Sequence, residues 1–443
     1  MRYDLRYPKE QDKFLLAASL LNQIRNDSND LPSLLQLQKF LLRQICSIEL
    51  KTRLLKKGRK RLKRSKSSVS RKNELSRQEK KHQVGLIKSL ISSSDERLND
   101  YKQLLFLWRY FGDAIVGIYH STYSLKHLFY DGDYNPKPNA GFITGKEGFR
   151  QEYKSLIFAI RKGIPTVLCD LTNIVRHGDL CLMGAEEPFL IEMKSSKNTN
   201  ARTDRQAEQL NVLGNFFAND GGENFRGAGP TKRVALSSSE VNYYSEVNQC
   251  LSTALNNGSC LTQPEKGLSY FSYTSQFIAN HSEGLKGILD RVVNETTMIV
   301  IVSPTESSLP LQSCALSFSP ENTCQFIQEE LHLVVLIDIN EVKEQIKQHG
   351  FHALAIMDGV FSFQLMVDKN DLLKGGCRIS EQMFLRIACE FQSLSWFATE
   401  SAHSLKNLLK LSEVIEPSEE NYTLNAEQFE EWDNTKDYVD EII

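Results

Sequence analysis

Apolar residues in the first hundred positions recur at alternating spacings of three and four. The most regular stretch covers residues 84–108, and a shorter one with the same spacing covers residues 41–62. The repeated positions of the longer stretch are Val84, Ile87, Ile91, Ser94, Leu98, Tyr101, Leu105 and Trp108. Such a repeat is typical of a coiled-coil seam or of a long antiparallel helical hairpin. The pattern therefore predicts a helical region over residues 1–111.

The middle of the chain alternates between helical and strand-like patterns. Residues 146–162 and 201–217 carry apolar positions at helical spacing, whereas residues 166–171 form a short apolar run that we expect to be a strand. Two more apolar runs, at 180–183 and 189–193, are separated by a turn containing Gly, Pro and two glutamates. Two strand-like runs joined by such a turn predict a β-hairpin.

The second half of the chain predicts further strands and helices. A strand at 232–236, a helix at 243–255 and a strand at 268–273 would complete an α/β core that ends near residue 275. Beyond it, strands are expected at 298–302, 331–339 and 352–366 (the last with a turn at Asp358-Gly359), and helices at 341–349 and 380–400. The resulting segments are a helical region at 1–111, an α/β core at 112–275, an α+β accessory domain at 285–412 and a tail at 413–443.

Length and composition place the chain among globular proteins of two or three domains, because it has 443 residues and a net charge of −2. No apolar run approaches the length needed to span a bilayer, and the polar N-terminus does not resemble a signal peptide. The nine cysteines show no metal-binding spacing, so we expect reduced thiols and a cytoplasmic location. The absence of a long apolar run predicts no membrane partner.

Basic residues are concentrated between the two helical repeats. Residues 51–82 contain fifteen Lys or Arg residues and two acids, a net charge of +13. Like charges repel, so we expect the tip at 63–72 to be frayed or disordered. One interpretation is an arm that lies on a nucleic-acid backbone, where neutralised phosphates release counterions; the other is a solvated coiled-coil tip. The residues expected to contact nucleic acid are Lys56, Lys57, Arg59, Lys60, Arg61, Lys63 and Arg64.

The opposite charge gathers at the other end of the chain. Residues 413–443 hold eleven acids and one lysine. The simplest expectation is a disordered, solubilising tail. An alternative is that the tail competes with DNA for the basic arm or for the active-site groove, since the two ends carry opposite charge.

The hairpin carries the strongest candidate chemistry. Asp179 begins its first strand, and Glu192 and Lys194 leave its second strand on one face, because strand side chains alternate with a period of two. Neighbouring carboxylates repel each other unless a divalent cation lies between them. A lysine beside such a cation can act on a bound water and offset phosphate charge. The alternative is a surface hairpin with an ordinary ion pair. We expect the adjacent His177 to make local hydrogen bonds and not to bind metal.

Asp179 followed by Glu192-x-Lys194 resembles the D…(D/E)xK signature of the restriction-endonuclease-like, or PD-(D/E)XK, nuclease superfamily. Gly178 departs from the proline that often precedes the aspartate. The resemblance implies a mixed β-sheet flanked by helices, and Mg²⁺ or Mn²⁺ bound by Asp179, Glu192 and the backbone carbonyl of Met193. It also implies that Lys194 acts on the attacking water.

The flanking helices supply further candidates that the superfamily often uses. Glu152 lies on the helix before the first strand, at the edge of its apolar stripe, and Gln206 lies on the apolar stripe of the helix after the hairpin. Arg202 and Arg205 are placed beside Gln206 and would meet phosphate. An unpaired glutamine on an apolar stripe is costly, which favours a role for Gln206 either in the core or at the site.

These expectations combine into a metal-dependent endonuclease that acts on DNA, in restriction or phage defence. Two alternatives stay open: a non-catalytic coiled-coil scaffold that binds nucleic acid, and an RNase on the same core. We further expect a homodimer through the coiled coil and an unknown partner for residues 285–412.

Overall fold

The computed structural model describes residues 5–71, 76–132, 135–138, 141–193, 201–227, 229–280, 287–289, 291–306, 311–371, 374–412 and 432. Its contacts divide the chain into two compact units, one made of residues 19–232 and the other of residues 1–18 and 233–443. The first helix, α1 (Gln11–Asn26), contributes residues to both units. This division differs from the expected segments, because the N-terminal helices and the hairpin share one unit.

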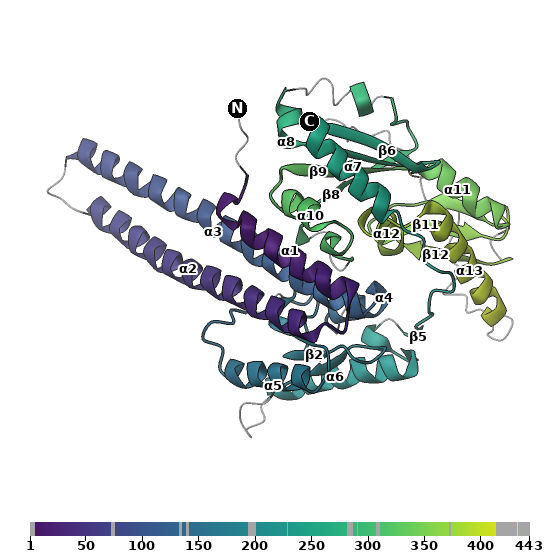
Figure 1. The fold of residues 1–443 in the computed structure, drawn as a ribbon, viewed down its shortest axis with the longest axis horizontal. Coiled ribbons are helices and arrows are strands. Elements are labelled where there is room, and N and C mark those ends of the chain that lie inside the picture. The colour runs from purple at the N-terminus through teal and green to yellow at the C-terminus, as the bar shows by residue number, and fades with distance from the viewer. Residues whose placement is uncertain are drawn as a thin grey trace. The chain divides into compact units, whose positions relative to one another are not determined.

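Two long helices dominate the unit of residues 19–232. Helix α2 (Leu31–Arg71) and helix α3 (Arg77–Tyr119) pack side by side along much of their length (Figure 1). Each repeated position between 84 and 108 is buried or half-buried, whereas most of the positions between them up to residue 100 are exposed. The prediction of a long helical hairpin is therefore confirmed. The expected fraying of its tip is wrong for residues 63–71, because α2 continues to Arg71. Residues 72–75 lie outside the described part of the chain.

One glycine lets helix α3 approach the loop that follows the first strand. A Cβ at Gly112 would lie 1.8 Å from the carbonyl oxygen of Leu171, so no side chain fits there. Gly85 belongs to the same helix, and a Cβ there would meet nothing within 4 Å. Glycine at position 112 is thus required by packing, whereas at position 85 it only weakens the helix.

We therefore expect opposite effects from the same substitution at these two glycines. Gly112→Ala should lower the free energy of unfolding by about 3 kcal/mol, because the backbone of the loop has to move. Gly85→Ala should raise it by up to about 1 kcal/mol through helix propensity. Urea unfolding followed by circular dichroism measures both. Equal effects of the two substitutions would contradict the close approach.

Downstream of α3, a small sheet is preceded and followed in sequence by a helix. Strands β1 (Thr166–Leu168), β2 (Leu180–Leu182) and β3 (Phe189–Ile191) follow α5 (Phe149–Arg161) and precede α6 (Ala201–Asn219). The strands pair in chain order, and Leu180 lies opposite Ile191. The predicted hairpin and both flanking helices are confirmed, although α5 begins three residues later than the helical pattern.

The expected mixed sheet is wrong for the described strands, because β1, β2 and β3 pair antiparallel throughout. The connections between them are short, whereas a parallel pair needs a long crossover. The edge of β1 is also covered: the side chain of Gln38, on α2, accepts a hydrogen bond from Leu168 N and donates one to Thr166 O. After α6, β4 (Gly221–Gly222) and β5 (Thr231–Lys232) pair with each other in a separate two-stranded sheet. The strand expected at 232–236 is therefore only partly present.

The other unit contains two antiparallel sheets. The first has the strand order β6 (Ser259–Glu265), β7 (Leu268–Thr274), β9 (Leu331–Asp338) and β8 (Thr297–Val302). The second has the order β10 (His352–Ala355), β11 (Phe361–Met366) and β12 (Gly376–Ser380). Its principal helices are α7 (Tyr244–Asn257), α8 (Ser275–Asn280), α10 (Pro320–Ile327), α11 (Ile339–Gln348), α12 (Glu381–Cys389) and α13 (Leu394–Ser412).

Two expectations for this unit are corrected. The strand at 268–273 forms, but as β7 it pairs with β6 and β9 and does not complete the sheet of the hairpin. The helix expected at 380–400 is broken into α12 and α13. Phe391 lies at the break with a φ of 54°, and its ring packs against Tyr270 and Phe318. Packing of this ring in the core therefore overrides the local helical pattern.

The acidic tail lies outside the described residues except at Trp432. The backbone N–H of Trp432 donates a hydrogen bond to Ala355 O at the end of β10. In the part of the chain that is described, helices of sufficient length and apolarity to cross a membrane are absent.

Candidate active site

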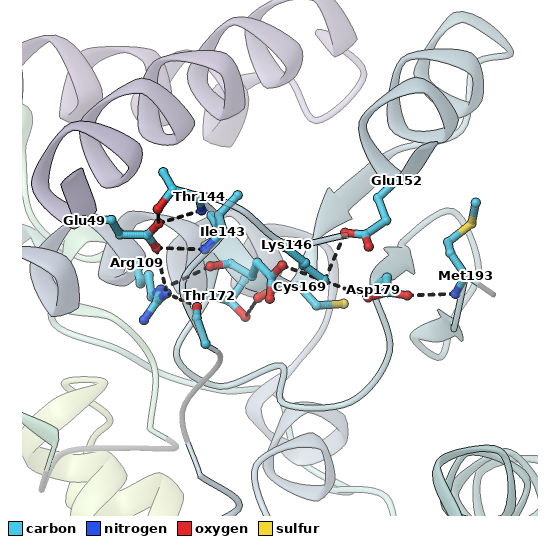
Figure 2. A network of polar contacts seen from close by, with 12 residues as sticks. Glu49, Arg109, Ile143, Thr144, Lys146, Glu152, Cys169, Thr172, Asp179 and Met193 are labelled. Carbon is cyan, nitrogen blue, oxygen red and sulfur yellow. Dashed lines mark hydrogen bonds and ion pairs between the residues drawn. The ribbon is translucent and has the colours of Figure 1, made fainter. Parts of the chain in front are cut away.

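Lys146 lies at the centre of the polar cluster beside the hairpin. Its Nζ is 2.8 Å from Asp179 Oδ1, 2.8 Å from Asp170 Oδ2 and 3.0 Å from Glu152 Oε2 (Figure 2). These three carboxylates come from different elements. Glu152 lies in the first turn of α5, Asp170 in the short 3-10 turn after β1, and Asp179 directly before β2.

The backbone of the hairpin fixes Asp179 in this cluster. Its N–H donates to Ile191 O at 2.8 Å, and its carbonyl accepts from Cys169 N at 3.0 Å. The second carboxylate oxygen, Oδ2, accepts from Met193 N at 2.7 Å. Gly178 has a φ of 74°, which turns the chain into the strand. The backbone of Asp179 is therefore held by β3 and by the residue that follows β1, and its carboxylate is held by the backbone just beyond β3.

The carboxylates open onto one cavity of about 1430 Å³. Among the residues that line it are Lys146, Glu152, Asp170, Asp179, Glu192 and Gln206. Glu192 follows β3, and Gln206 projects from the first half of α6. The structure thus brings four of the five predicted catalytic residues to one cavity, the fifth being Lys194, which lies outside the described residues.

Charge and burial act together in the cluster. Burial disfavours the charged form of Lys146, but attraction to Asp170 and Asp179 outweighs it and raises the pKa of the ammonium. Burial raises the pKa of Glu152, while the hydrogen bond from Lys146 opposes that shift. Burial and the charge of Asp179 both raise the pKa of Glu192. Four carboxyl groups, those of Glu152, Asp170, Asp179 and Glu192, accompany the one ammonium of Lys146, so the formal charge of these groups is negative.

The loop that carries Lys146 is attached to the two long helices. Glu49, on α2, accepts hydrogen bonds from Ile143 N at 3.0 Å and from Thr144 N at 2.8 Å. Arg53, one turn further along α2, donates to Thr144 O, and Arg109, on α3, donates to Gly141 O at 3.3 Å. Arg109 also donates from Nε to Asp170 O at 3.1 Å, and Figure 2 shows Glu49 with Ile143, Thr144 and Arg109 beside the cluster around Lys146. The backbone before Lys146 is accordingly well fixed.

His177 makes local hydrogen bonds, as expected. Its Nε2 lies 2.9 Å from Tyr130 O, and its Nδ1 lies 3.3 Å from Lys137 Nζ. Burial, assisted by the charge of Lys137, lowers the pKa of His177 to about 4. A neutral imidazole that donates to the carbonyl and accepts from the ammonium satisfies both contacts.

The basic residues predicted to contact nucleic acid differ in their exposure and in their place in the fold. Lys56, Lys57, Lys60, Arg61, Lys63 and Arg64 are exposed on α2. Arg59 is half-buried, and its Nε lies 2.6 Å from Asp95 Oδ1. Arg205 is exposed on α6 and does not line the cavity, while the side chain of Arg202 lies outside the description. Arg53, which is not among the predicted contacts, lines the cavity itself.

Sequence reasoning missed Lys146 and Asp170. Asp170 lies within the apolar run 166–171 that predicts a strand, and a charged residue near the end of a buried strand is the signal that indicates it. Lys146 stands between Gly145 and Gly148, both of which have positive φ. The helical pattern places it at the start of a helix, whereas α5 begins at Phe149. No spacing rule connects this lysine with the carboxylates.

The donor atoms suit a hard cation, because carboxylate oxygens are the preferred ligands of Mg²⁺ and Mn²⁺. Among the residues that are described, however, there is no group of three or more His, Cys, Asp or Glu side chains arranged to hold a metal ion. The point on which Glu152, Asp170 and Asp179 converge is taken by the Lys146 ammonium. The donor chemistry therefore fits a divalent cation, and a positive charge already stands at its centre.

Comparison with known proteins returned no matching family model, no matching curated protein and no matching solved structure.

Proposed function

We propose that the chain is a Mg²⁺- or Mn²⁺-dependent nuclease that hydrolyses phosphodiester bonds of DNA. The observation that carries the proposal is the gathering of Glu152, Asp170, Asp179 and Glu192 on one cavity beside the hairpin. The order helix, three strands, helix around that cavity agrees with the PD-(D/E)XK resemblance. An ordinary surface hairpin would not bury several carboxylates at one point, since burying charge without function is costly.

Each residue has a defined task in this proposal. Asp179 and Glu192, with the backbone carbonyl of Met193, would hold the cation, which when bound supplies Lewis-acid stabilisation and lowers the pKa of water. Glu152 and Asp170 add negative charge at the same place. Lys194 would act on the attacking water, and Gln206 would orient the scissile strand from α6. The pocket also carries Arg53, Lys137 and Arg176, whose positive charges suit a phosphate backbone.

The test is cleavage of plasmid and linear DNA in the presence of Mg²⁺ or Mn²⁺ by the parent chain and by Lys194→Ala. Cleavage that requires the cation and is lost in the variant supports the proposal, and linearised plasmid would show an endonuclease. RNA of the same length, assayed in parallel, separates an RNase from a DNase. Absence of cleavage of either nucleic acid would contradict the proposal.

A second candidate function is a non-catalytic scaffold that binds nucleic acid, favoured by the row of exposed basic residues on α2. In this alternative the helical hairpin contacts phosphates, and the carboxylate cluster has only a structural role. Tight, salt-sensitive binding without cleavage would be its signature. We also propose a role in restriction or phage defence, a homodimer through the helical hairpin of α2 and α3, and a partner for residues 285–412.

Neutralising the exposed basic residues of α2 should weaken binding to DNA in both functions. For the combined variant Lys60→Gln, Arg61→Gln, Lys63→Gln and Arg64→Gln, the slope of log K against log salt should flatten by up to about 4. Fluorescence anisotropy with a labelled duplex, measured at several salt concentrations, gives this slope. The matched control replaces four exposed lysines of the other unit, Lys347, Lys369, Lys406 and Lys410, with glutamine. An equal change of slope in the control would contradict a specific role for the arm.

A further inference from the structure

One cation already stands among the carboxylates. The Nζ of Lys146 contacts Glu152, Asp170 and Asp179 at nearly equal distances, 2.8 to 3.0 Å, although these residues lie 6, 24 and 33 positions away in sequence. Three charged acceptors match the three donors of an ammonium group. Lys146 is therefore bound as an ion and not merely placed nearby.

Without that ammonium the cluster would repel itself. The side chains of Glu152, Asp179 and Asp170 are only 3%, 9% and 15% exposed, so water screens them poorly. The nearby Glu192 adds a further carboxylate whose charge interacts with that of Asp179. Removing the partner from a buried carboxylate is strongly destabilising. Lys146 is thus the group that keeps the carboxylates together when no other cation is present.

A divalent cation would compete with the ammonium for Asp179, which is also a proposed metal ligand, and for the adjacent carboxylates of Glu152 and Asp170. Hard cations prefer carboxylate ligands, and two cations at one point repel each other. We propose that Lys146 is a built-in counter-ion that holds the position of the divalent cation and moves aside when that cation binds. This inference rests on the proposed function only in taking the ligand of the cluster to be a divalent metal ion.

The surroundings of Lys146 permit such a movement. Its side chain is 28% exposed and faces the cavity of about 1430 Å³. Its four-carbon stem is flexible. The backbone of Ile143 and Thr144 is meanwhile fixed by Glu49, so the side chain can move without displacing the loop.

The exchange has a consequence for ion selectivity. A monovalent ion that replaces the ammonium brings no additional charge, whereas a divalent ion brings one more unit to a cluster with excess negative charge. The cluster should therefore bind Ca²⁺ or Mn²⁺ and ignore Na⁺ at the same ionic strength.

The experiment compares the parent chain with Lys146→Met, and uses Lys154→Met as the matched control because Lys154 is exposed on α5. Isothermal titration calorimetry with Ca²⁺ and with Mn²⁺ should show at least about tenfold tighter binding to Lys146→Met than to the parent, since the competing charge is gone. In EDTA, Lys146→Met should unfold at a lower temperature than the parent chain. Addition of Ca²⁺ or Mn²⁺ should reduce this difference in unfolding temperature. Lys154→Met and Lys146→Arg should both behave like the parent.

Several outcomes would overturn the inference: unchanged or weaker binding of the divalent ions to Lys146→Met, equal restoration of its stability by Na⁺, or absence of divalent-ion binding to the parent. If Lys146→Met does not fold in EDTA, its folding on addition of Ca²⁺ becomes the measurement, and failure to fold with Ca²⁺ counts against the inference.

Cleavage assays on the same preparations separate this inference from the proposed function. If divalent ions compete with Lys146 but the protein cleaves no nucleic acid, the inference holds and the proposed nuclease function is wrong. If the protein shows metal-dependent cleavage but Lys146→Met does not change its ion affinity, the nuclease function holds and the inference about Lys146 is wrong.

Discussion

Asp179→Asn is expected to reduce metal-dependent DNA cleavage by at least about 100-fold, because even partners of metal ligands change affinity or activity by 10- to 100-fold. In the present structure Oδ1 of Asp179 accepts from Lys146 and Oδ2 accepts from Met193 N. An amide keeps the size of the side chain but loses its charge, and only one of its two terminal atoms accepts. The measurement is the initial rate of plasmid cleavage at saturating Mg²⁺.

The control for Asp179→Asn is Glu186→Gln, an exposed acid in the turn of the same hairpin. It removes the same charge from the same supersecondary element, yet lies outside the residues that line the cavity. Circular dichroism should show that both variants are folded. A cleavage rate of Asp179→Asn within threefold of the parent would exclude Asp179 from the chemistry.

Glu49→Ala should produce the largest loss of stability, about 3–5 kcal/mol, as expected when one partner of a buried charged network is removed. Glu49 is fully buried and accepts hydrogen bonds from Ile143 N, Thr144 N and the Thr144 hydroxyl. It also lies 3.9 Å from the guanidinium of Arg109, which would lose this ion pair. The measurement is the free energy of unfolding from urea denaturation.

Two further variants serve as controls for Glu49→Ala. Glu49→Gln keeps one acceptor in the same place and should cost less than Glu49→Ala. Glu96→Ala removes an exposed acid from α3 and should stay within about 0.5 kcal/mol of the parent. A loss for Glu49→Ala as small as that for Glu96→Ala would show that the loop before Lys146 does not depend on Glu49.

Local sequence patterns predicted where helices and strands form in this chain better than they predicted which elements pair or pack together. The repeat at 84–108 and the hairpin at 180–193 follow from side-chain periodicity, which acts over a few residues. The pairing of β7 with β9 joins Leu268 to Ile337, and no short-range pattern selects that partner. The same reason explains the broken helix at Phe391, whose neighbours Tyr270 and Phe318 come from distant parts of the chain.

The same distinction separates the residues of the candidate site that the sequence predicts from those that it does not. Asp179 and Glu192 could be predicted because they belong to one hairpin, and Glu152 and Gln206 because each occupies a defined position on a flanking helix. Lys146 could not, since its role consists of contacts with residues from three separate elements. Its sequence neighbourhood, a glycine-containing loop, carries no chemical signature of its own.

The attachment of the Lys146 loop to α2 would couple the two proposed binding sites, the basic helix and the carboxylate cluster. Arg53 contributes its guanidinium to Thr144 O and lies over the ring of Phe142, and Lys56 lies over the same ring. A phosphate that draws Arg53 away would release one hold on the loop that presents Lys146 to its carboxylates. Such coupling is reciprocal. If a bound phosphate changes the ion affinity of the cluster by a given factor, a bound ion would change the phosphate affinity of α2 by the same factor.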